Sequence, residues 1–357
     1  MSRYMNESFR SLEAYVPGEQ PKDMKYIKLN TNESPYAPSD GVLEAVRGEQ
    51  AENLNLYPDP QCAELKEAIA TLYGVQKDNV FVSNGSDDIL NFFFMAFCNG
   101  DSHPVKFPDI SYGFYEVFAQ LYGVKYTKVP LLSDFTVNIE DYFGNDSNVV
   151  IANPNAPTGI ALGRKEIQQI LEKNPDRVVV VDEAYVDFGG ESCVELTQRY
   201  DNLLVVCTYS KSRSMAGARL GFAIANKEII ADLEKIKFST NPYSINRLTM
   251  AAGIAAINDN DYYMDNCKKI VDTRQNTVKE LEKLGFEVLP SSANFIFAKN
   301  DGLDGEELYL KLRQRGILVR HFSAAQICQY NRITIGTPQQ MSALIEQISN
   351  ILKERKL

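Results

Sequence analysis

Lys211 is the residue in this chain whose type and position point most directly to chemistry. It follows the apolar, β-branched run Leu203–Thr208, which predicts a buried strand. A lysine at the end of such a strand is partly desolvated, which disfavours the ammonium form and leaves a nucleophilic amine. Arg219, eight residues further on, adds a fixed cation. The pair suits an aldehyde that carries a phosphate, which points to pyridoxal phosphate (PLP), whereas a Ser-Lys pair taken alone is more often part of an exposed loop.

A second candidate follows the run Val178–Val181. Four valines are too apolar for a surface strand, so we expect Asp182 after them to be desolvated. A buried carboxylate needs a partner. A protonated pyridine nitrogen would be such a partner, and the pair would keep the ring cationic and able to accept electrons. A helix N-cap or a structural ion pair explains Asp182 equally well if it is considered alone.

Three more candidates lie in turns that follow predicted strands. The turn Gly85-Ser86-Asp87 opens a helix, so its backbone N–H groups and the Ser86 hydroxyl would hold a phosphate, unless Ser86 is an ordinary N-cap. The ring of Tyr112 would stack on a flat heteroaromatic group or belong to the core. Asn155 lies between two prolines that predict a rigid turn, and it would aim its amide at a ring oxygen or belong to a plain loop.

Composition excludes several other functions. The net charge of −10 argues against binding to nucleic acid or to acidic membranes. Six scattered cysteines without a Cys-x-x-Cys pair, and only two histidines, argue against a disulfide framework, a metal site and a Ser-His-Asp triad. The N-terminus has no apolar signal core, and no run approaches the ~20 apolar residues of a membrane span. We therefore expect a cytoplasmic protein that holds no metal.

The order of the predicted elements indicates an α/β fold. Strand-like runs alternate with helical segments between residues 79 and 225, which is typical of a mostly parallel sheet covered on both faces. A long amphipathic helix from Asp261 to Leu284 then precedes a smaller α+β region. The expected organisation is an N-terminal arm over 1–40 that joins the small domain, a large domain over 41–245 and a small C-terminal domain over 246–357. Ligands of parallel sheets bind at the carboxyl ends of the strands, where these candidates would meet.

The combined motifs resemble the fold-type I PLP-dependent aminotransferases over essentially the whole chain. The resemblance rests on Ser210-Lys211 with Arg219, on Asp182 with Tyr185, on Asn-x-Pro-Thr-Gly at 155–159, and on Gly85-Ser86-Asp87. Within that superfamily the chain most resembles the histidinol-phosphate aminotransferases, through the segments at 15–18, 29–35, 57–59, 316–320 and 332–337.

The resemblance implies a role for each candidate. Lys211 would bind the cofactor covalently and later move a proton between substrate and cofactor, while Asp182 would hold the pyridine N–H. Tyr185 and an Asn would bind the ring hydroxyl. That Asn normally precedes Pro-Thr-Gly, but this chain has Ala156 there, so either Asn155 replaces it or the contact is missing. The remaining implied roles are ring stacking by Tyr112, phosphate binding by Gly85, Ser86, Asp87, Ser210, Arg219 and, from the second subunit of a homodimer, Tyr57, and substrate binding by Arg332, Arg320, Tyr15 and Asn32.

The implied reaction is a PLP-dependent transamination. L-Histidinol phosphate would give its amino group to 2-oxoglutarate, forming imidazole acetol phosphate and glutamate in histidine biosynthesis. An aromatic amino-acid aminotransferase and a threonine-phosphate decarboxylase share the cofactor residues and stay open as alternatives. A PLP-fold sensor in a transcription regulator would need a DNA-binding region, and a nicotinamide dehydrogenase would need a glycine fingerprint that this chain lacks.

Overall fold

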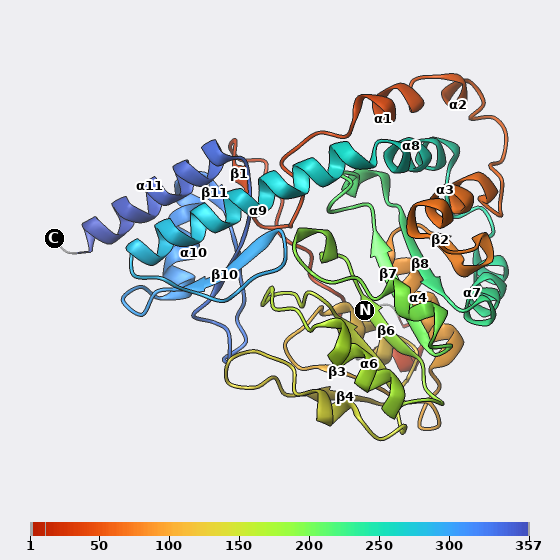
Figure 1. Ribbon diagram of the computed structural model, residues 1–357. Helices are drawn as coiled ribbons and strands as arrows, with labels where there is room; N and C mark the ends of the chain where they lie inside the picture. Colours follow the sequence, from red (N-terminus) through yellow and green to blue (C-terminus); the bar gives the residue numbers. More distant parts are fainter. Residues whose placement is uncertain (1–2, 11, 356–357) are drawn as a thin grey trace.

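A seven-stranded sheet forms the centre of the large lobe of the computed structural model, which describes residues 3–10 and 12–355 (Figure 1). Every strand pairing in this sheet is parallel except those of β8 (Gly221–Ala225), which is antiparallel to both of its neighbours. The predicted mostly parallel sheet is therefore confirmed. In spatial order the strands are β2 (Val80–Ser83), β8 (Gly221–Ala225), β7 (Leu203–Thr208), β6 (Val179–Asp182), β5 (Asn148–Ala152), β3 (Val105–Pro108) and β4 (Tyr126–Val129).

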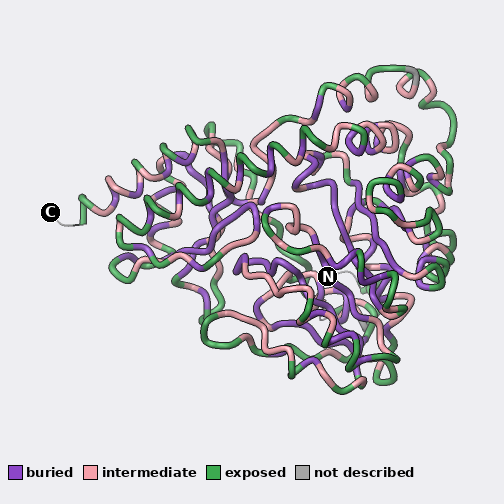
Figure 2. Tube along the Cα trace, in the orientation of Figure 1, coloured by how far each residue is buried: buried purple, intermediate pink, exposed green. Residues whose placement is uncertain are grey.

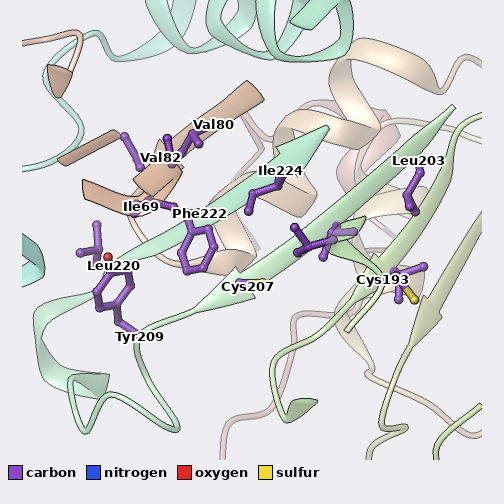
Figure 3. Close-up of a cluster of buried hydrophobic side chains, with 14 of the residues drawn as sticks. Ile69, Val80, Val82, Cys193, Leu203, Cys207, Tyr209, Leu220, Phe222 and Ile224 are labelled. Carbon is purple, nitrogen blue, oxygen red and sulfur yellow. The ribbon is translucent and has the colours of Figure 1, made fainter. Parts of the chain in front are cut away.

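Helices cover both faces of this sheet because side chains alternate between its faces. Val80 and Val82 belong to one buried cluster and Phe81, between them, to the other. Figure 3 shows part of the first cluster, where Phe222 and Leu203 come from neighbouring strands, and Figure 2 shows the buried strands inside a shell of exposed helix faces. The first cluster is covered by α3 (Ala63–Tyr73), α6 (Arg164–Lys173) and α8 (Arg247–Asn258), and the second by α4 (Ser86–Phe97), α5 (Phe114–Leu121) and α7 (Lys227–Thr240).

The small lobe contains a four-stranded antiparallel sheet with three helices packed on it. The N-terminal arm also reaches this lobe, because β1 (Ile27–Lys28) pairs with β11 (Ile317–Leu318) and Leu29 is buried in the lobe's core. The sheet has the order β12 (Arg320–His321), β13 (Asn331–Thr334), β10 (Phe295–Lys299) and β9 (Glu287–Val288), and its helices are α9 (Asn260–Lys283), α10 (Gly305–Gln314) and α11 (Pro338–Glu354).

The long helix α9 connects the two lobes (Figure 1). Tyr263, near its start, lies in the core of the large lobe, whereas Ile270 and Leu281 lie in the core of the small one. The preceding helix α8 belongs to the large lobe through Ala252 and Ala256, and α1 (Asp40–Ala45) and α2 (Glu49–Glu52) pack against it. We therefore propose that the division falls within α9 rather than at residue 246. In the described residues no helix is both long and apolar enough to cross a membrane.

Candidate active site

The carboxyl edge of the large sheet brings most of the predicted site residues together. β2 leads into Ser86, β6 ends at Asp182 and β7 is followed by Lys211. Arg219 precedes its strand instead of following it, but β8 runs in the opposite direction, so its first residue pairs with the last residues of β2 and β7. The reversed strand thus carries Arg219 to the same edge as the lysine.

These residues line a cavity of about 470 Å³. Its volume is in the range of small-molecule and cofactor sites. The lining residues that were predicted from the sequence are Ser86, Asp87, Tyr112, Asp182, Tyr185, Ser210, Lys211 and Arg219. Those that were not predicted are Gln20, Thr31, Glu33, Ala152, Ala156, Ala184, Thr208, Ala216 and Gly217, several of which are small residues whose position no chemical pattern reveals.

Asp182 is a buried carboxylate that forms no ion pair among the described residues. Its side chain accepts hydrogen bonds from the Tyr115 hydroxyl at 2.9 Å and from the Ala184 backbone N–H at 3.2 Å. Burial raises the pKa of Asp182 to about 6, although these two hydrogen bonds oppose the rise. Tyr115 was not singled out in the sequence because an aromatic residue three positions after Tyr112 looks like any core residue of a helix.

The amine of Lys211 faces the cavity with few partners. Its Nζ donates to the Thr31 carbonyl over 3.4 Å and lies 5.7 Å from the centre of the Tyr185 ring. No carboxylate of the described residues forms an ion pair with it. Beside it, the Thr208 hydroxyl donates to Ser210 Oγ over 3.0 Å, which fixes the turn between β7 and the lysine. The amine is therefore not held in a salt bridge, and it faces the space in which a carbonyl group would react with it.

A second part of the cavity lies at the start of α4. Gly85 has a φ of 91°, and a Cβ there would lie 2.7 Å from Arg219 Nη2, so only glycine lets the guanidinium approach the helix start. Arg219 contacts Asp87 at 3.3 Å, and the Tyr112 hydroxyl donates to the same carboxylate at 2.7 Å. Because this carboxylate is an acceptor, Asp87 offers an anion only its backbone N–H. That N–H, the Ser86 hydroxyl and Arg219 are donors that could hold an anion.

Tyr112 holds its place through that hydrogen bond and through ring contacts. Its ring packs edge-on against Tyr115 at 5.7 Å, and it lines the cavity. Burial and the neighbouring Asp87 raise the pKa of Tyr112 far above its ordinary value, so the phenol stays a neutral donor. The ring therefore offers a fixed aromatic surface in the cavity. It also packs against other aromatic side chains, as expected if Tyr112 is a core residue.

Asn155 is not among the residues that line the cavity, and its contact with the cofactor stays a prediction. Its amide is occupied within the loop: Oδ1 accepts from Ser111 over 2.8 Å, and Nδ2 donates to the Ile110 carbonyl and to Thr158. Both X-Pro bonds of this turn are cis. Ala156, and not Asn155, lines the cavity. These contacts are those expected of the plain-loop interpretation of Asn155.

Two arginines and a tyrosine gather beside the cavity. The guanidinium of Arg332 lies 5.4 Å from the centre of the Phe295 ring, which packs edge-on against Tyr185 at 5.0 Å. Its Nε is buried without a hydrogen-bond partner in the described residues. Tyr15 stacks on Phe114 at 4.2 Å, and its pKa is raised by burial against the opposing charges of both Arg332 and Arg320. Arg332 and Arg320, which we call the arginine pair, lie beside Tyr15 and could hold a second anion.

The two other predicted substrate contacts have different surroundings. Arg320 donates to the carbonyls of Val16 and Pro17 over 3.3 and 3.4 Å, so it also holds the N-terminal arm in place. Asn32 is buried and donates to the hydroxyl of Tyr185 over 2.9 Å. It is not one of the cavity-lining residues.

Tyr57 lies outside this constellation within the chain. It is 76% exposed, and its ring stacks on Tyr243 at 4.5 Å. Arg247 holds the segment by donating to the carbonyls of Leu56 and Tyr57 over 3.1 and 2.7 Å. In the described part of a single chain no contact connects Tyr57 with the cavity, so its predicted role depends on a second subunit.

The cavity suits PLP in charge and in shape. A protonated pyridine nitrogen would supply the cation that Asp182 lacks, and the anion site at the start of α4 would hold the phosphate. Lys211 is the free amine that the aldehyde requires. Glycine at position 85 leaves room there that a Cβ would fill. The residues present therefore fit the cofactor.

A site of this kind on a mostly parallel sheet defines the class of PLP-dependent enzymes of fold type I. Residues 24–348 match the family described as aminotransferase class I and II, and the chain belongs to that family. The resemblance predicted from the motifs is thereby confirmed, and PLP is the cofactor of this chain.

Individual relatives cover the chain from end to end. It is 50% identical to a histidinol-phosphate aminotransferase of Brachyspira hyodysenteriae, covering 99% of this chain and all of that one. It is 49% identical to one of Clostridium beijerinckii, covering all of this chain and 99% of that one. The crystal structure of a histidinol-phosphate aminotransferase from Sinorhizobium meliloti in complex with pyridoxal-5′-phosphate has a TM-score of 0.87 at 24% identity, covering 98% of this chain and 99% of that one. At that identity the similarity shows the fold alone.

Proposed function

We propose that the enzyme transfers the amino group of L-histidinol phosphate to 2-oxoglutarate, giving imidazole acetol phosphate and glutamate in histidine biosynthesis. The observation that carries the proposal is the arginine pair, an anion site separate from the one at the start of α4. A phosphorylated amine needs a second anion site beside that of the cofactor phosphate. The names of the full-length relatives at 49–50% identity support the same substrate.

The proposed roles of the cofactor-binding residues follow from their contacts. Asp182 accepts the ring N–H and keeps the ring cationic, and Tyr115 holds that carboxylate in place. Ser86, the backbone N–H of Asp87, Ser210 and Arg219 bind the phosphate. When bound, PLP supplies an aldehyde that takes up the amino group and a conjugated ring that accepts electrons from the substrate carbon.

Lys211 is the proposed acid and base of the reaction. Its Nζ would hold the cofactor, and the free amine would take the proton from the substrate carbon. The absence of a salt bridge to Nζ in the described residues supports this role, because no carboxylate holds the amine away from the substrate.

Arg332 is proposed to bind both substrates, through the phosphate of one and the carboxylate of the other. Its planar guanidinium suits a phosphate and a carboxylate, each through two parallel hydrogen bonds. Its packing against Phe295 fixes the plane of the group, and its Nε has no partner in the described residues that a ligand would have to displace. Tyr15 and Arg320 complete the site for the substrate phosphate.

Product identification tests the function. The PLP-loaded enzyme is incubated with 2-oxoglutarate and, in turn, with L-histidinol phosphate, L-phenylalanine and L-threonine phosphate, and the products are separated by mass. The proposal expects imidazole acetol phosphate and glutamate from the first donor at a kcat/KM at least about tenfold above that of the others. Carbon dioxide from threonine phosphate, or a preference for phenylalanine, would contradict it.

We further propose that the active unit is a homodimer with Tyr57 contributed across the interface. Leu54, Leu56, Tyr57 and Tyr243 are large apolar residues of one region that are each at least 43% exposed, which is typical of a surface that another chain covers. Mixing a Tyr57→Ala chain with a Lys211→Ala chain tests this, because a hybrid dimer contains one intact site. Recovery of about a quarter of the wild-type activity is expected, and no recovery in dimers shown to have exchanged would contradict the proposal.

We also propose that the enzyme acts in the cytoplasm. Its six cysteines are free thiols, five of them buried, as expected in a reducing compartment. Activity that follows a cytoplasmic marker when the source cells are fractionated would support this location.

A further inference from the structure

Asn32 lies where the two lobes meet, and both its backbone and its side chain are hydrogen-bonded. Its Nδ2 donates to Tyr185 over 2.9 Å, and its Oδ1 accepts from the Thr334 hydroxyl over 2.9 Å. Its backbone N–H donates to the same Thr334 oxygen over 2.9 Å, and its carbonyl accepts from Asn294 Nδ2 over 3.0 Å. The residue is 1% exposed and has a left-handed φ of 56°, which asparagine tolerates better than most residues.

These contacts fix which way each proton points. The Thr334 oxygen accepts the backbone N–H of Asn32, so its own proton goes to Asn32 Oδ1. With Oδ1 accepting from Thr334, the amide has its Nδ2 toward Tyr185. The Tyr185 oxygen therefore accepts from Asn32, and its own proton is free to be donated elsewhere. In the described residues the Tyr185 hydroxyl has one side-chain hydrogen bond, the one from Asn32, and Tyr185 lines the cavity.

We propose that Asn32 is a positioning residue that makes Tyr185 a hydrogen-bond donor toward the cavity, with Thr334 setting the orientation of Asn32. Resting on the proposed function, the acceptor is the ring oxygen of PLP. This role differs from the substrate contact that the sequence predicted for Asn32. It also explains how Tyr185 alone would bind that oxygen, since Ala156 occupies the position where the family usually has an Asn.

The arrangement connects the small lobe with the cofactor. Thr334 lies on β13 and Asn294 just before β10, both in the small lobe, whereas Tyr185 follows β6 of the large lobe. The hydrogen bond between Asn32 and Tyr185 therefore joins the lobes next to the reacting group. A movement of the small lobe would therefore change the hydrogen bond that Tyr185 donates to the ring oxygen.

The consequence is measurable in the absorbance of the Lys211-bound cofactor. A donor to the ring oxygen stabilises its anionic form and withdraws electron density from the nitrogen that joins lysine to the cofactor. That nitrogen then holds its proton less tightly, so the absorbance changes with pH at a lower midpoint. Loss of the donor raises the midpoint.

Four variants test the proposal by pH titration of the visible absorbance and by the dissociation constant of PLP. Thr334→Val removes the hydroxyl at nearly constant volume, and Thr334→Ser is its matched control. Asn32→Gly removes the amide and tolerates the left-handed backbone. Tyr185→Phe removes the donor itself. Apoprotein melting curves identify variants that fail to fold, and the titrations are compared among those that fold.

The proposal expects Tyr185→Phe to raise the midpoint by about one pH unit, the size of one hydrogen bond. Asn32→Gly and Thr334→Val shift it in the same direction and weaken PLP binding several-fold, whereas Thr334→Ser does neither. If Asn32→Gly and Thr334→Val match the wild type in both measurements while Tyr185→Phe does not, Asn32 does not act through Tyr185. A wild-type protein without any band of Lys211-bound cofactor would instead contradict the proposed function.

Discussion

Replacing Asp182 by asparagine would stabilise the protein without its cofactor and weaken the binding of that cofactor. The carboxylate is buried, and its pKa is raised from 3.8 to about 6, chiefly by burial. A raised carboxyl pKa contributes stability that is present below the ordinary value and lost as the pH rises through about 6. At neutral pH the folded apoprotein therefore carries a charge that destabilises it, and the neutral amide of the Asp182→Asn variant would remove that charge.

The size of the effect follows from the pKa values. A rise from 3.8 to about 6 corresponds to about 3 kcal/mol of the free energy of unfolding, at ~1.4 kcal/mol for each pKa unit. An asparagine side chain fits the site, because its oxygen can accept from the Ala184 N–H and its amide can donate to the Tyr115 oxygen. The tyrosine then loses an acceptor for its proton, at a cost of about 1 kcal/mol. A net stabilisation of about 2 kcal/mol is expected above pH 7.

Urea unfolding of the apoproteins measures this difference directly. The free energy of unfolding of Asp182→Asn, relative to the wild type, should grow by about 2 kcal/mol between about pH 4.5 and about pH 8. The neighbouring Glu183 is present in both proteins, so its contribution cancels in the comparison. In the same variant, PLP should bind about 10- to 100-fold more weakly, because a charge-assisted hydrogen bond to the ring is lost. Asp182→Glu serves as a control that keeps the charge.

Two results would refute this reasoning. An apoprotein that loses stability at pH 8 on Asp182→Asn would mean that the carboxylate is stabilised by a cation within the fold. An unchanged dissociation constant for PLP would mean that the carboxylate does not face the ring nitrogen.

Three further predictions concern the other parts of the site. Lys211→Ala should lower transaminase activity at least about a hundredfold and remove the absorbance of the lysine-bound cofactor, and full activity would contradict its role. Gly85→Ala places a Cβ 2.7 Å from Arg219, so weaker PLP binding and a loss of about 1–3 kcal/mol of stability are expected in binding and unfolding assays. Arg332→Lys keeps the charge but not the planar fork, so the KM values for the phosphorylated donor and for 2-oxoglutarate should both rise about tenfold, and an effect on one alone would show that the substrates bind at different groups.

Much of the large lobe could be predicted because its buried strands have strong local signals. The predicted run Leu203–Thr208 is β7 to the residue, and β8 ends at residue 225, where the predicted alternation of strands and helices ends. The reversed direction of β8 could not be read from its composition, since an apolar run looks the same either way along the chain. The helices α7 and α8 were missed, although Ile229, Ile230 and Leu233 of α7 have helical spacing and are buried.

The site was harder to predict where it depends on side-chain direction. Local motifs led to the lysine, the carboxylate and the helix start, which lie at strand ends. The direction of the Asn155 side chain could not be predicted, because an Asn within a turn can satisfy its amide inside that turn, and nothing in the spacing reveals which way it points. The contact between Asn32 and Tyr185 spans 153 positions and arises only when the lobes meet.

The most direct test of the account is a visible absorbance scan of the PLP-loaded protein before and after L-histidinol phosphate is added without any 2-oxo acid. The account predicts a band of Lys211-bound cofactor that the amine converts, in one turnover, to the band of pyridoxamine phosphate, and that 2-oxoglutarate then restores. A band that histidinol phosphate leaves unchanged would contradict the proposed substrate, and a soluble protein that forms no such band would contradict the role of Lys211.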